Sequence, residues 1–341
     1  MVEAGVRRRP AVATFHSGRG DPVWDAVVGV VPRSGGCLGR WLLDFARATH
    51  GREVVLVRGT SSWEDRYRDY LGMVLLRVTR SRARVVVSDA TLDVGSAAVG
   101  RRLPARLRPL VPWASRLLVR LADSPRTTWC VLSSEEVETF ADRWRLRAGA
   151  RGRTVLTRFF HTVDVAAWAP RTTDGGYLFS GGDSLRDYEA LAHAVDGLDV
   201  PVRVATRRPV PAFPPTVEAG PTDHATFVAL LAGCTALVLP LVAAPRSTGQ
   251  QTYLSAMALG KPVVVTDAPG VRDLVEDGVT GLVADRGADG LRRAVDRLLA
   301  MSPQERARMG AAARAATLVP RSPEAYRARL LEVAGLGPGR A

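Results

Sequence analysis

The stretch from Ser247 to Leu282 constrains the fold more than any other part of this 341-residue chain. It opens with a polar, glycine-containing turn, and the small residues after it predict a helix over 251–259. Gly260 and Pro262 end that helix, because glycine favours the conformation that follows a helix and proline cannot continue one. Pro262 also opens a short apolar run that predicts a buried parallel strand. A helix N-terminus beside the carboxyl end of a strand suits a phosphorylated ligand.

The letters of this stretch, LSAMALGKPVVVTDAPGVRDLVEDGVTGLV, resemble the donor-binding segment of GT-B glycosyltransferases, most closely those of the retaining family 4. That family usually has Glu-Ala-Met-Ala-x-Gly-x-Pro-Val-Val at the start of the segment and Asp-Gly-x-x-Gly-Leu at its end. The resemblance implies an α/β fold of two Rossmann-like, doubly wound parallel-sheet domains that face each other across a cleft. The alternative is that the stretch is only one more βα unit of a doubly wound sheet.

A βαβ pattern with a glycine-rich turn opens the chain. Residues 25–32 predict a strand, residues 41–49 an amphipathic helix and residues 53–57 a second strand. This order resembles the opening of family 4 enzymes. The resemblance implies that Gly35 and Gly36 form the loop beneath the donor phosphate and the acceptor.

The order of strand and helix patterns predicts three parts of the chain. By the resemblance, residues 1–170 form an acceptor-side domain, residues 171–320 a nucleotide-sugar donor domain, and residues 321–341 a helix that packs back on the first domain. The segment FFHTVDVAAWAP stands where the family crosses between its two halves. His161 lies in this crossover, where it is either part of the acceptor-side loop or a structural residue.

Transfer of a glycosyl group requires that the diphosphate leaving group be neutralised. Positive charge and backbone N–H groups at helix N-termini can do this without a covalent nucleophile. Gly181 and Gly182 allow the chain to approach a phosphate closely, and Arg186 is the leading candidate for a catalytic phosphate clamp. The alternative for Arg186 is a solvated position on a helix. Arg207 or Arg246 could complete the clamp.

The chain departs from the family where two glutamates, eight positions apart, hold the donor sugar and the ribose. Ser247 and Ser255 occupy the matching positions. Other polar groups remain for donor binding, namely Thr248, Gly249, Gln250 and Gln251. Backbone amides in this turn still suit a phosphate or a sugar hydroxyl. The missing glutamates leave the identity of the donor open.

Asp89 follows a predicted strand over 84–88 and could orient or deprotonate an acceptor hydroxyl. A helix-capping or loop hydrogen bond is the alternative for this carboxylate. No His, Cys or carboxylate cluster has the spacing of metal ligands, which agrees with the metal-independent reaction that the resemblance implies. We therefore expect no metal and no cofactor beyond the nucleotide-sugar co-substrate.

The net charge of +13 is due almost wholly to arginine and favours anionic partners. Because the arginines are dispersed and no recognition motif accompanies them, we do not expect nucleic-acid binding. In the segment Arg101–Leu121 arginines recur beside leucines, although its prolines limit the predicted helix to 113–122. This pattern predicts either a surface that faces anionic lipid or an ordinary packed helix with solvated arginines.

Three cysteines without a CxxC motif favour free thiols in a reducing cytoplasm. No apolar run is long enough to span a bilayer, and the start lacks the apolar core of a signal peptide. We expect a cytoplasmic protein, with peripheral attachment to the inner face of the membrane as an open question.

The resemblance implies a glycosyltransferase that moves a sugar from a nucleotide-sugar to a hydroxyl-bearing acceptor. That acceptor could be a lipid carrier, a polysaccharide precursor or a natural product. Two alternatives remain: a catalytically weakened homologue that serves as a binding or partner subunit, and a sugar-nucleotide epimerase on the same fold.

Overall fold

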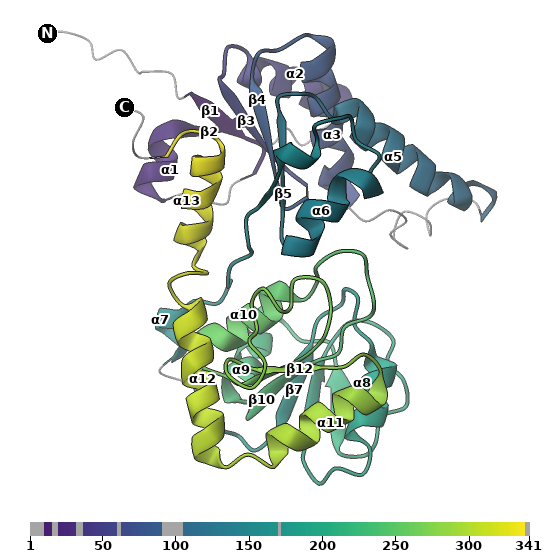
Figure 1. Cartoon of the computed structure of the whole chain (residues 1–341), viewed down its shortest axis with the longest axis vertical. Helices are drawn as coiled ribbons and strands as arrows, with labels where there is room; N and C mark the ends of the chain where they lie inside the picture. The colour runs from purple at the N-terminus through teal and green to yellow at the C-terminus, as the bar shows by residue number, and fades with distance from the viewer. Residues whose placement is uncertain are drawn as a thin grey trace, which may run out of the picture. The chain divides into compact units, whose positions relative to one another are not determined.

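The computed structural model describes residues 10–15, 20–31, 37–59, 63–90, 105–169 and 172–337. The chain divides into two compact units, one of Met1–Thr157 with Tyr326–Ala341 and one of Arg158–Ala325 (Figure 1). The boundaries predicted at residues 170 and 320 both fall inside the second unit. Gly35 and Gly36 lie outside the described residues, as does the start of the Arg101–Leu121 segment.

The first unit contains a parallel sheet in the order β2-β1-β3-β4-β5-β6. Its central strands are apolar and buried on both faces, as expected for a sheet covered by helices on both sides. The strands are β1 (Ala11–Ala13), β2 (Val28–Val30), β3 (Val54–Arg58), β4 (Arg84–Ser88), β5 (Thr127–Val131) and β6 (Thr154–Leu156).

Helices cover this sheet, and Phe140 of α6 with Trp144 at its end packs in one core cluster with Trp129 of β5. The helices are α1 (Pro22–Val27), α2 (Leu38–Thr49), α3 (Trp63–Val78), η1 (Ala105–Leu110), α5 (Val111–Ala122), α6 (Ser134–Arg143) and η2 (Arg151–Arg153). The last helix, α13 (Pro323–Val333), belongs to this unit from Tyr326 onward.

The strand predicted over residues 25–32 is wrong in its first half, because helix α1 occupies residues 22–27. The Asp21 side chain accepts hydrogen bonds from the backbone N–H groups of Val23 and Trp24, and Pro22 fits the first turn of a helix. These signals start a helix before the apolar run, which forms only the short strand β2. The chain also forms β1, a strand that was not predicted and that pairs with both β2 and β3.

The second unit contains a parallel sheet in the order β12-β11-β10-β7-β8-β9. Counted along this unit, its strands follow the 3-2-1-4-5-6 order of the Rossmann fold, and the order reverses between β7 and β10. The strands are β7 (Leu178–Gly181), β8 (Val202–Ala205), β9 (Val217–Gly220), β10 (Ala236–Leu239), β11 (Val263–Thr266) and β12 (Leu282–Ala284). The predicted α/β fold with two doubly wound parallel sheets is confirmed.

The helices of the second unit are α7 (Val165–Trp168), α8 (Tyr188–Val195), α9 (His224–Gly233), α10 (Gln250–Ala258), α11 (Ala288–Leu299) and α12 (Pro303–Thr317). Ser302 and Glu305 form a reciprocal capping box at the start of α12. Gly310 of α12 lies against Gly260, which follows α10, and a side chain at position 310 would collide with the Gly260 carbonyl oxygen. None of the helices in the described part of the chain is long and apolar enough to cross a membrane.

Candidate functional site

A cavity of about 350 Å³ lies at the carboxyl edge of the second sheet, beside the point where the strand order reverses. Ligands of open α/β sheets bind at this edge and at this reversal. We call it the β7–α10 cavity. It is lined by Thr162, Val163, Gly182, Arg207, His224, Phe227, Val228, Leu231, Gln251, Thr252 and Ser255. A smaller hollow of about 170 Å³ adjoins it and shares Gly182, Arg207, His224 and Phe227.

The end of β7 brings the chain close to this cavity through two glycines. A Cβ atom at Gly181 would lie 2.5 Å from the ring of Phe227, so this glycine lets that ring pack beside the strand. Phe227 meets Phe179 edge to face, with ring centroids 5.2 Å apart. Gly182 has φ +112°, which L side chains rarely adopt, and a Cβ there would meet the guanidinium of Arg186.

Arg186 lies behind this loop and lines neither hollow; it is buried, with 8% of its surface exposed. Its Nε donates to the carbonyl oxygen of Gly181 (3.0 Å), its Nη1 to that of Ser184 (2.6 Å), and its Nη2 to Thr252 Oγ1 (3.3 Å). Burial lowers the pKa of Arg186 to about 10. This value is still well above neutral pH, so the side chain remains charged there. The arginine therefore joins the β7 loop to the first turn of α10.

The N-terminus of α10 supplies the opposite wall. Gly249, with φ +73°, precedes the helix, and no side chain caps it. Gln251 Nε2 donates to Thr162 Oγ1 (2.9 Å), and Ser255 Oγ accepts a hydrogen bond from the backbone N–H of Thr162 (3.3 Å). The positive end of the helix dipole and several hydroxyl groups thus face the cavity, an arrangement suited to phosphate and sugar oxygens.

Other predicted donor-binding residues lie beneath this wall. Ser247, Thr248 and Gln250 are buried and do not line the cavity. Arg246 Nη1 donates to the Ser247 carbonyl oxygen at 3.2 Å, while its buried Nε has no hydrogen-bond partner among the described residues. Of the two positions where the family has glutamate, only Ser255 lines the cavity.

An ion pair marks the rim beside the smaller hollow. Arg207 Nη2 lies 2.7 Å from Asp183 Oδ2, and 79% of the arginine side chain is exposed. Burial raises the pKa of Asp183, but hydrogen bonds from the backbone and side chain of Arg207 and from Thr206 outweigh it and hold the pKa below its usual value. The exposed guanidinium can turn toward a bound phosphate, because surface ion pairs of this kind are weak.

Sequence reasoning missed several lining residues, among them Thr162, Thr252, His224 and Phe227. His224 begins α9, whose N-cap Asp223 accepts a hydrogen bond from the Thr226 N–H group at 2.7 Å. Asp223 could have predicted these lining residues, because it is a typical helix-capping residue and a helix that follows a strand in this fold starts at the carboxyl edge of the sheet.

The predicted residues outside the cavity lie in two other places. His161 is buried, and its ring Nε2 lies 3.2 Å from the Leu318 carbonyl oxygen. The backbone N–H of His161 donates to the carbonyl oxygen of Arg321 (3.0 Å). These bonds join the crossover segment to the end of α12. Asp89, in the first unit, is buried after β4 with φ +49°, and Tyr326 Oη donates a hydrogen bond to it. Burial raises the pKa of the Asp89 carboxyl group.

The second unit, which contains this cavity, includes a match to a known family. Residues 216–301 match the family described as Glycosyl transferases group 1. This range contains α9, with His224 and Phe227, and the whole of α10. No curated protein matches the sequence significantly.

Solved structures resemble the whole chain at low sequence identity. A sucrose-phosphate synthase from Thermosynechococcus elongatus is 18% identical, with a TM-score of 0.61 over 90% of this chain and 79% of that one. A glycosyltransferase from Rickettsia africae is 11% identical, with a TM-score of 0.63 over 98% and 91%. HepE from Anabaena, solved with UDP-glucose, is 15% identical, with a TM-score of 0.62 over 95% and 91%.

The two Rossmann-like units and these likenesses define the fold class as GT-B. The matched domain narrows this class: the chain is a glycosyltransferase with a group 1 domain in its second unit.

Proposed function

We propose that this protein transfers a sugar from a nucleotide-sugar donor to a hydroxyl-bearing acceptor. One observation supports this most: the β7–α10 cavity lies where a doubly wound sheet binds nucleotides, and the group 1 domain supplies α9 and α10 to its wall. Its lining combines a helix N-terminus, hydroxyl groups and one exposed arginine, which suits a diphosphate that bears a sugar.

In this proposal the diphosphate lies between the Gly182 loop and the first turn of α10. Arg207 and the helix dipole stabilise the negative charge that develops on the leaving oxygen. The bond between the anomeric carbon and that oxygen breaks, the acceptor oxygen bonds to the same carbon, and the hydroxyl proton leaves with the departing diphosphate or with a base. The smaller hollow beside Phe227 and His224 takes the nucleoside. By family analogy the reaction is retaining and metal-independent.

UDP-glucose is the first donor to test, since HepE was solved with it. The measurement is the rise in melting temperature with UDP-, ADP- and GDP-sugars and the matching nucleotide diphosphates, because a ligand that binds only the folded state stabilises it. Arg207→Gln should cut the shift for the preferred donor by more than half, whereas Arg308→Gln, an exposed arginine of α12, should leave it unchanged. No shift with any nucleotide sugar at millimolar concentration would refute the proposal.

Ser247 and Ser255 favour a second candidate, a homologue that binds the donor but transfers poorly. Release of free nucleotide diphosphate, with and without candidate acceptors, separates the two. A protein whose melting temperature rises with a nucleotide sugar, yet which releases no nucleotide above the uncatalysed rate, is a binding subunit. Ser255→Glu, which restores the family's carboxylate at a lining position, then becomes the informative variant.

For the acceptor we propose a hydroxyl group that reaches the carboxyl edge of the first sheet, where Asp89 follows β4. The predicted role of Gly35 and Gly36, which lie outside the described residues, stays a prediction. A lipid carrier, a polysaccharide precursor or a natural product would each supply such a hydroxyl. We also propose a cytoplasmic location, since Cys37, Cys130 and Cys234 are all free.

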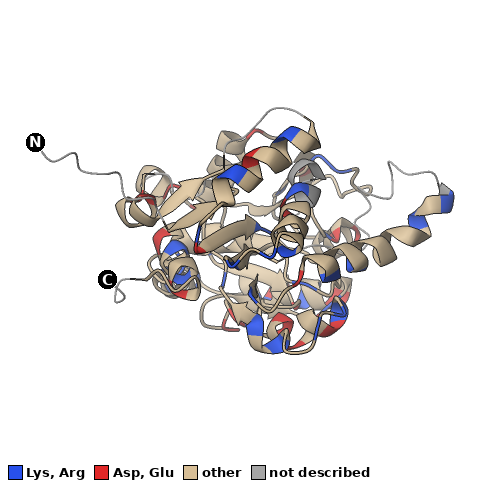
Figure 2. Cartoon of the chain, turned by 90° about the horizontal axis from the view of Figure 1, so that it is seen from above, with Lys and Arg blue, Asp and Glu red and all other residues tan. Residues whose placement is uncertain are grey.

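We further propose that η1 and α5 rest on an anionic membrane surface. Five apolar side chains on this segment are exposed: Leu107, Leu110, Trp113, Leu117 and Leu121. Exposed arginines lie among them, and the sequence from residue 105 to residue 122 contains no Asp or Glu. Figure 2 shows basic positions in blue along η1 and α5. An exposed apolar stripe flanked by arginine is the pattern of an interfacial helix.

Sedimentation with vesicles tests this surface. We expect binding to phosphatidylglycerol vesicles and not to phosphatidylcholine vesicles, with loss in a Trp113→Ser/Leu117→Ser variant. Leu43→Ser/Val78→Ser removes two exposed apolar side chains of the same unit outside this segment and should bind as the wild type does. Equal binding by both variants would contradict the assignment of this surface.

A further inference from the structure

A second cavity, of about 520 Å³, lies in the first unit at the amino-terminal edge of its sheet. It is formed by the last turns of α3, the end of α5 and the starts of β4 and β5. Asp89 follows β4 at the opposite edge of the same sheet. The cavity is therefore separate from every residue in the proposed transfer reaction.

The floor of this cavity is apolar. Met73 and Leu76 of α3, Val85 of β4 and Ala122 of α5 line it, and each is buried with less than 9% of its surface exposed. These side chains leave open a space in the size range of small-molecule sites. A floor of this kind favours a ligand with a hydrocarbon part, because removing apolar surface from water is favourable.

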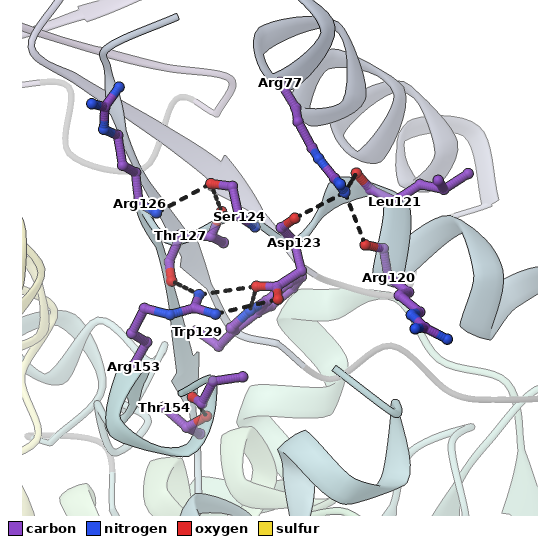
Figure 3. Close-up of polar contacts among 11 residues, drawn as sticks. Arg77, Arg120, Leu121, Asp123, Ser124, Arg126, Thr127, Trp129, Arg153 and Thr154 are labelled. Carbon is purple, nitrogen blue, oxygen red and sulfur yellow. Dashed lines mark hydrogen bonds and ion pairs between the residues drawn. The ribbon is translucent and has the colours of Figure 1, made fainter. Parts of the chain in front are cut away.

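Four arginines surround the floor: Arg77, Arg80, Arg82 and Arg126. Arg77 is half-buried, and its Nη1 donates to the carbonyl oxygens of Leu121 (2.8 Å), Arg120 (3.2 Å) and Asp123 (3.2 Å) at the end of α5 (Figure 3). Arg126 Nη1 donates to the Ser81 carbonyl oxygen at 3.1 Å. These acceptors are backbone carbonyl groups, and those at the end of α5 carry only the partial negative charge of a helix C-terminus, so a net positive charge remains.

The buried carboxylate of Asp123, which lies between the lining residues Ala122 and Ser124, is hydrogen-bonded to other partners. Asp123 Oδ1 accepts from Trp129 Nε1 (3.0 Å) and Arg153 Nη1 (2.9 Å), and its Oδ2 accepts from Arg153 Nη2 (3.2 Å) (Figure 3). Within the part of the chain that the structure describes, no carboxylate lines the cavity and none lies within 4.0 Å of its four arginines. Four guanidinium groups around one hollow repel each other and attract an anion.

We propose that this cavity is a second ligand site, which binds an anionic amphiphile. Its phosphate head is held by Arg80, Arg82 and Arg126 at the mouth, and its unbranched apolar tail lies on Met73 and Leu76. Guanidinium groups suit the head, because they bind phosphate oxygens in pairs. This inference does not rest on the proposed transfer reaction, since it concerns the other unit and the other edge of a sheet.

The test is isothermal titration of the full chain with three probes below their micelle concentrations: octyl phosphate, inorganic phosphate and octyl glucoside. Octyl phosphate should bind at least about tenfold more tightly than inorganic phosphate, since only it contributes apolar burial as well as charge. Octyl glucoside, which has the tail without the charge, should not saturate. Equal affinity for octyl phosphate and octyl glucoside, or no saturable binding of octyl phosphate, would overturn the proposal.

A matched pair of variants localises the binding. Arg80→Gln/Arg82→Gln removes two exposed arginines from the mouth and should weaken octyl phosphate binding at least about tenfold. Arg40→Gln/Arg147→Gln removes the same charge from exposed positions of the same unit outside the cavity and should bind as the wild type does. Melting temperatures establish that both variants fold. Equal loss in both variants would show a general charge effect and contradict the site.

Competition identifies the source of the ligand. Phosphatidylglycerol vesicles that displace octyl phosphate from the wild type indicate a lipid headgroup, whereas vesicles that bind without displacing it indicate a free amphiphilic phosphate. The Trp113→Ser/Leu117→Ser variant retains the cavity and should retain octyl phosphate binding, which separates this site from the η1–α5 surface.

Discussion

Replacing Arg186 by methionine separates two roles for the residue that the sequence singles out most strongly in the donor half. As a direct phosphate clamp, its loss would weaken donor binding and leave the fold intact. The structure instead buries it behind Gly182, with hydrogen bonds to Gly181, Ser184 and Thr252. We therefore expect Arg186→Met to destabilise the second unit and to weaken donor binding only through the displaced loop.

The expected magnitude follows from two opposing effects. Three hydrogen bonds from a charged donor contribute roughly 1.5–3 kcal/mol each. Against them, burial lowers the pKa of Arg186 from 12.5 to about 10, which corresponds to roughly 3 kcal/mol of desolvation at about 1.4 kcal/mol per tenfold change. Methionine fills part of the same space but satisfies none of the three acceptors. The free energy of unfolding should fall by about 2–5 kcal/mol.

Thermal and urea unfolding of the full chain, followed by circular dichroism, measure this loss. A fall of this size should lower the melting temperature of a unit of this length by roughly 5–15 °C. Arg207→Gln is the control, because 79% of its side chain is exposed and it lines the cavity directly. That variant should change stability by less than about 1 kcal/mol while it weakens the nucleotide-induced shift.

The opposite behaviour of Arg186→Met would refute a structural role for this arginine. Wild-type stability in Arg186→Met, combined with complete loss of nucleotide binding, would mean that the guanidinium contacts the ligand. The role predicted from the sequence, a direct phosphate clamp, would then be correct.

Contacts of Asp89, Gly310 and Arg153 predict how substitutions at these residues change the stability of the protein. Asp89→Asn should stabilise the protein more at about pH 8 than at about pH 5. Burial raises the pKa of Asp89, so the contribution of this carboxyl group to the free energy of unfolding is complete only below a pH of about 3.8 and is lost as the pH rises through the folded-state pKa, whereas asparagine stays neutral. A difference in melting temperature between variant and wild type that does not widen with pH would contradict this. Gly310→Ala should lower the free energy of unfolding by about 1–3 kcal/mol or more in urea titration, because its Cβ would overlap the Gly260 carbonyl oxygen. Arg153→Met should lower it by about 3–5 kcal/mol, because it leaves the fully buried Asp123 carboxylate without its ion pair.

Two matched substitutions serve as controls for Gly310→Ala and Arg153→Met. Gly39→Ala lies in a helix with open space around the new Cβ and should be neutral or stabilising by about 0.5–1 kcal/mol. Arg293→Met breaks an exposed pair with Asp285 and should cost less than about 1 kcal/mol. Costs as large as those of Gly310→Ala or Arg153→Met would mean that neither burial nor close contact sets the effect.

Local chemistry let the sequence predict much of the second unit. The helix predicted over 251–259 is α10, because small residues favour a helix that packs closely and Gly260 with Pro262 must end it. The start of α12 follows from Ser302, Pro303 and Glu305, whose cap needs only neighbouring residues. The resemblance to GT-B glycosyltransferases rests on the contiguous segment 247–282, which lies inside the range 216–301 that matches the group 1 family.

Only the tertiary structure decided which polar side chains reach the cavity. Arg186 and Ser247 lie close in sequence to lining residues, yet neighbouring elements cover both. His224 and Phe227 come from another helix, and Gly181 at the end of β7 leaves room for the Phe227 ring. In the first unit, Arg126 meets Arg77, Arg80 and Arg82 at one hollow, because the pairing of β4 with β5 brings two distant segments of the chain together. Spacing fixes which face of an element a side chain occupies, but burial depends on what packs against that face.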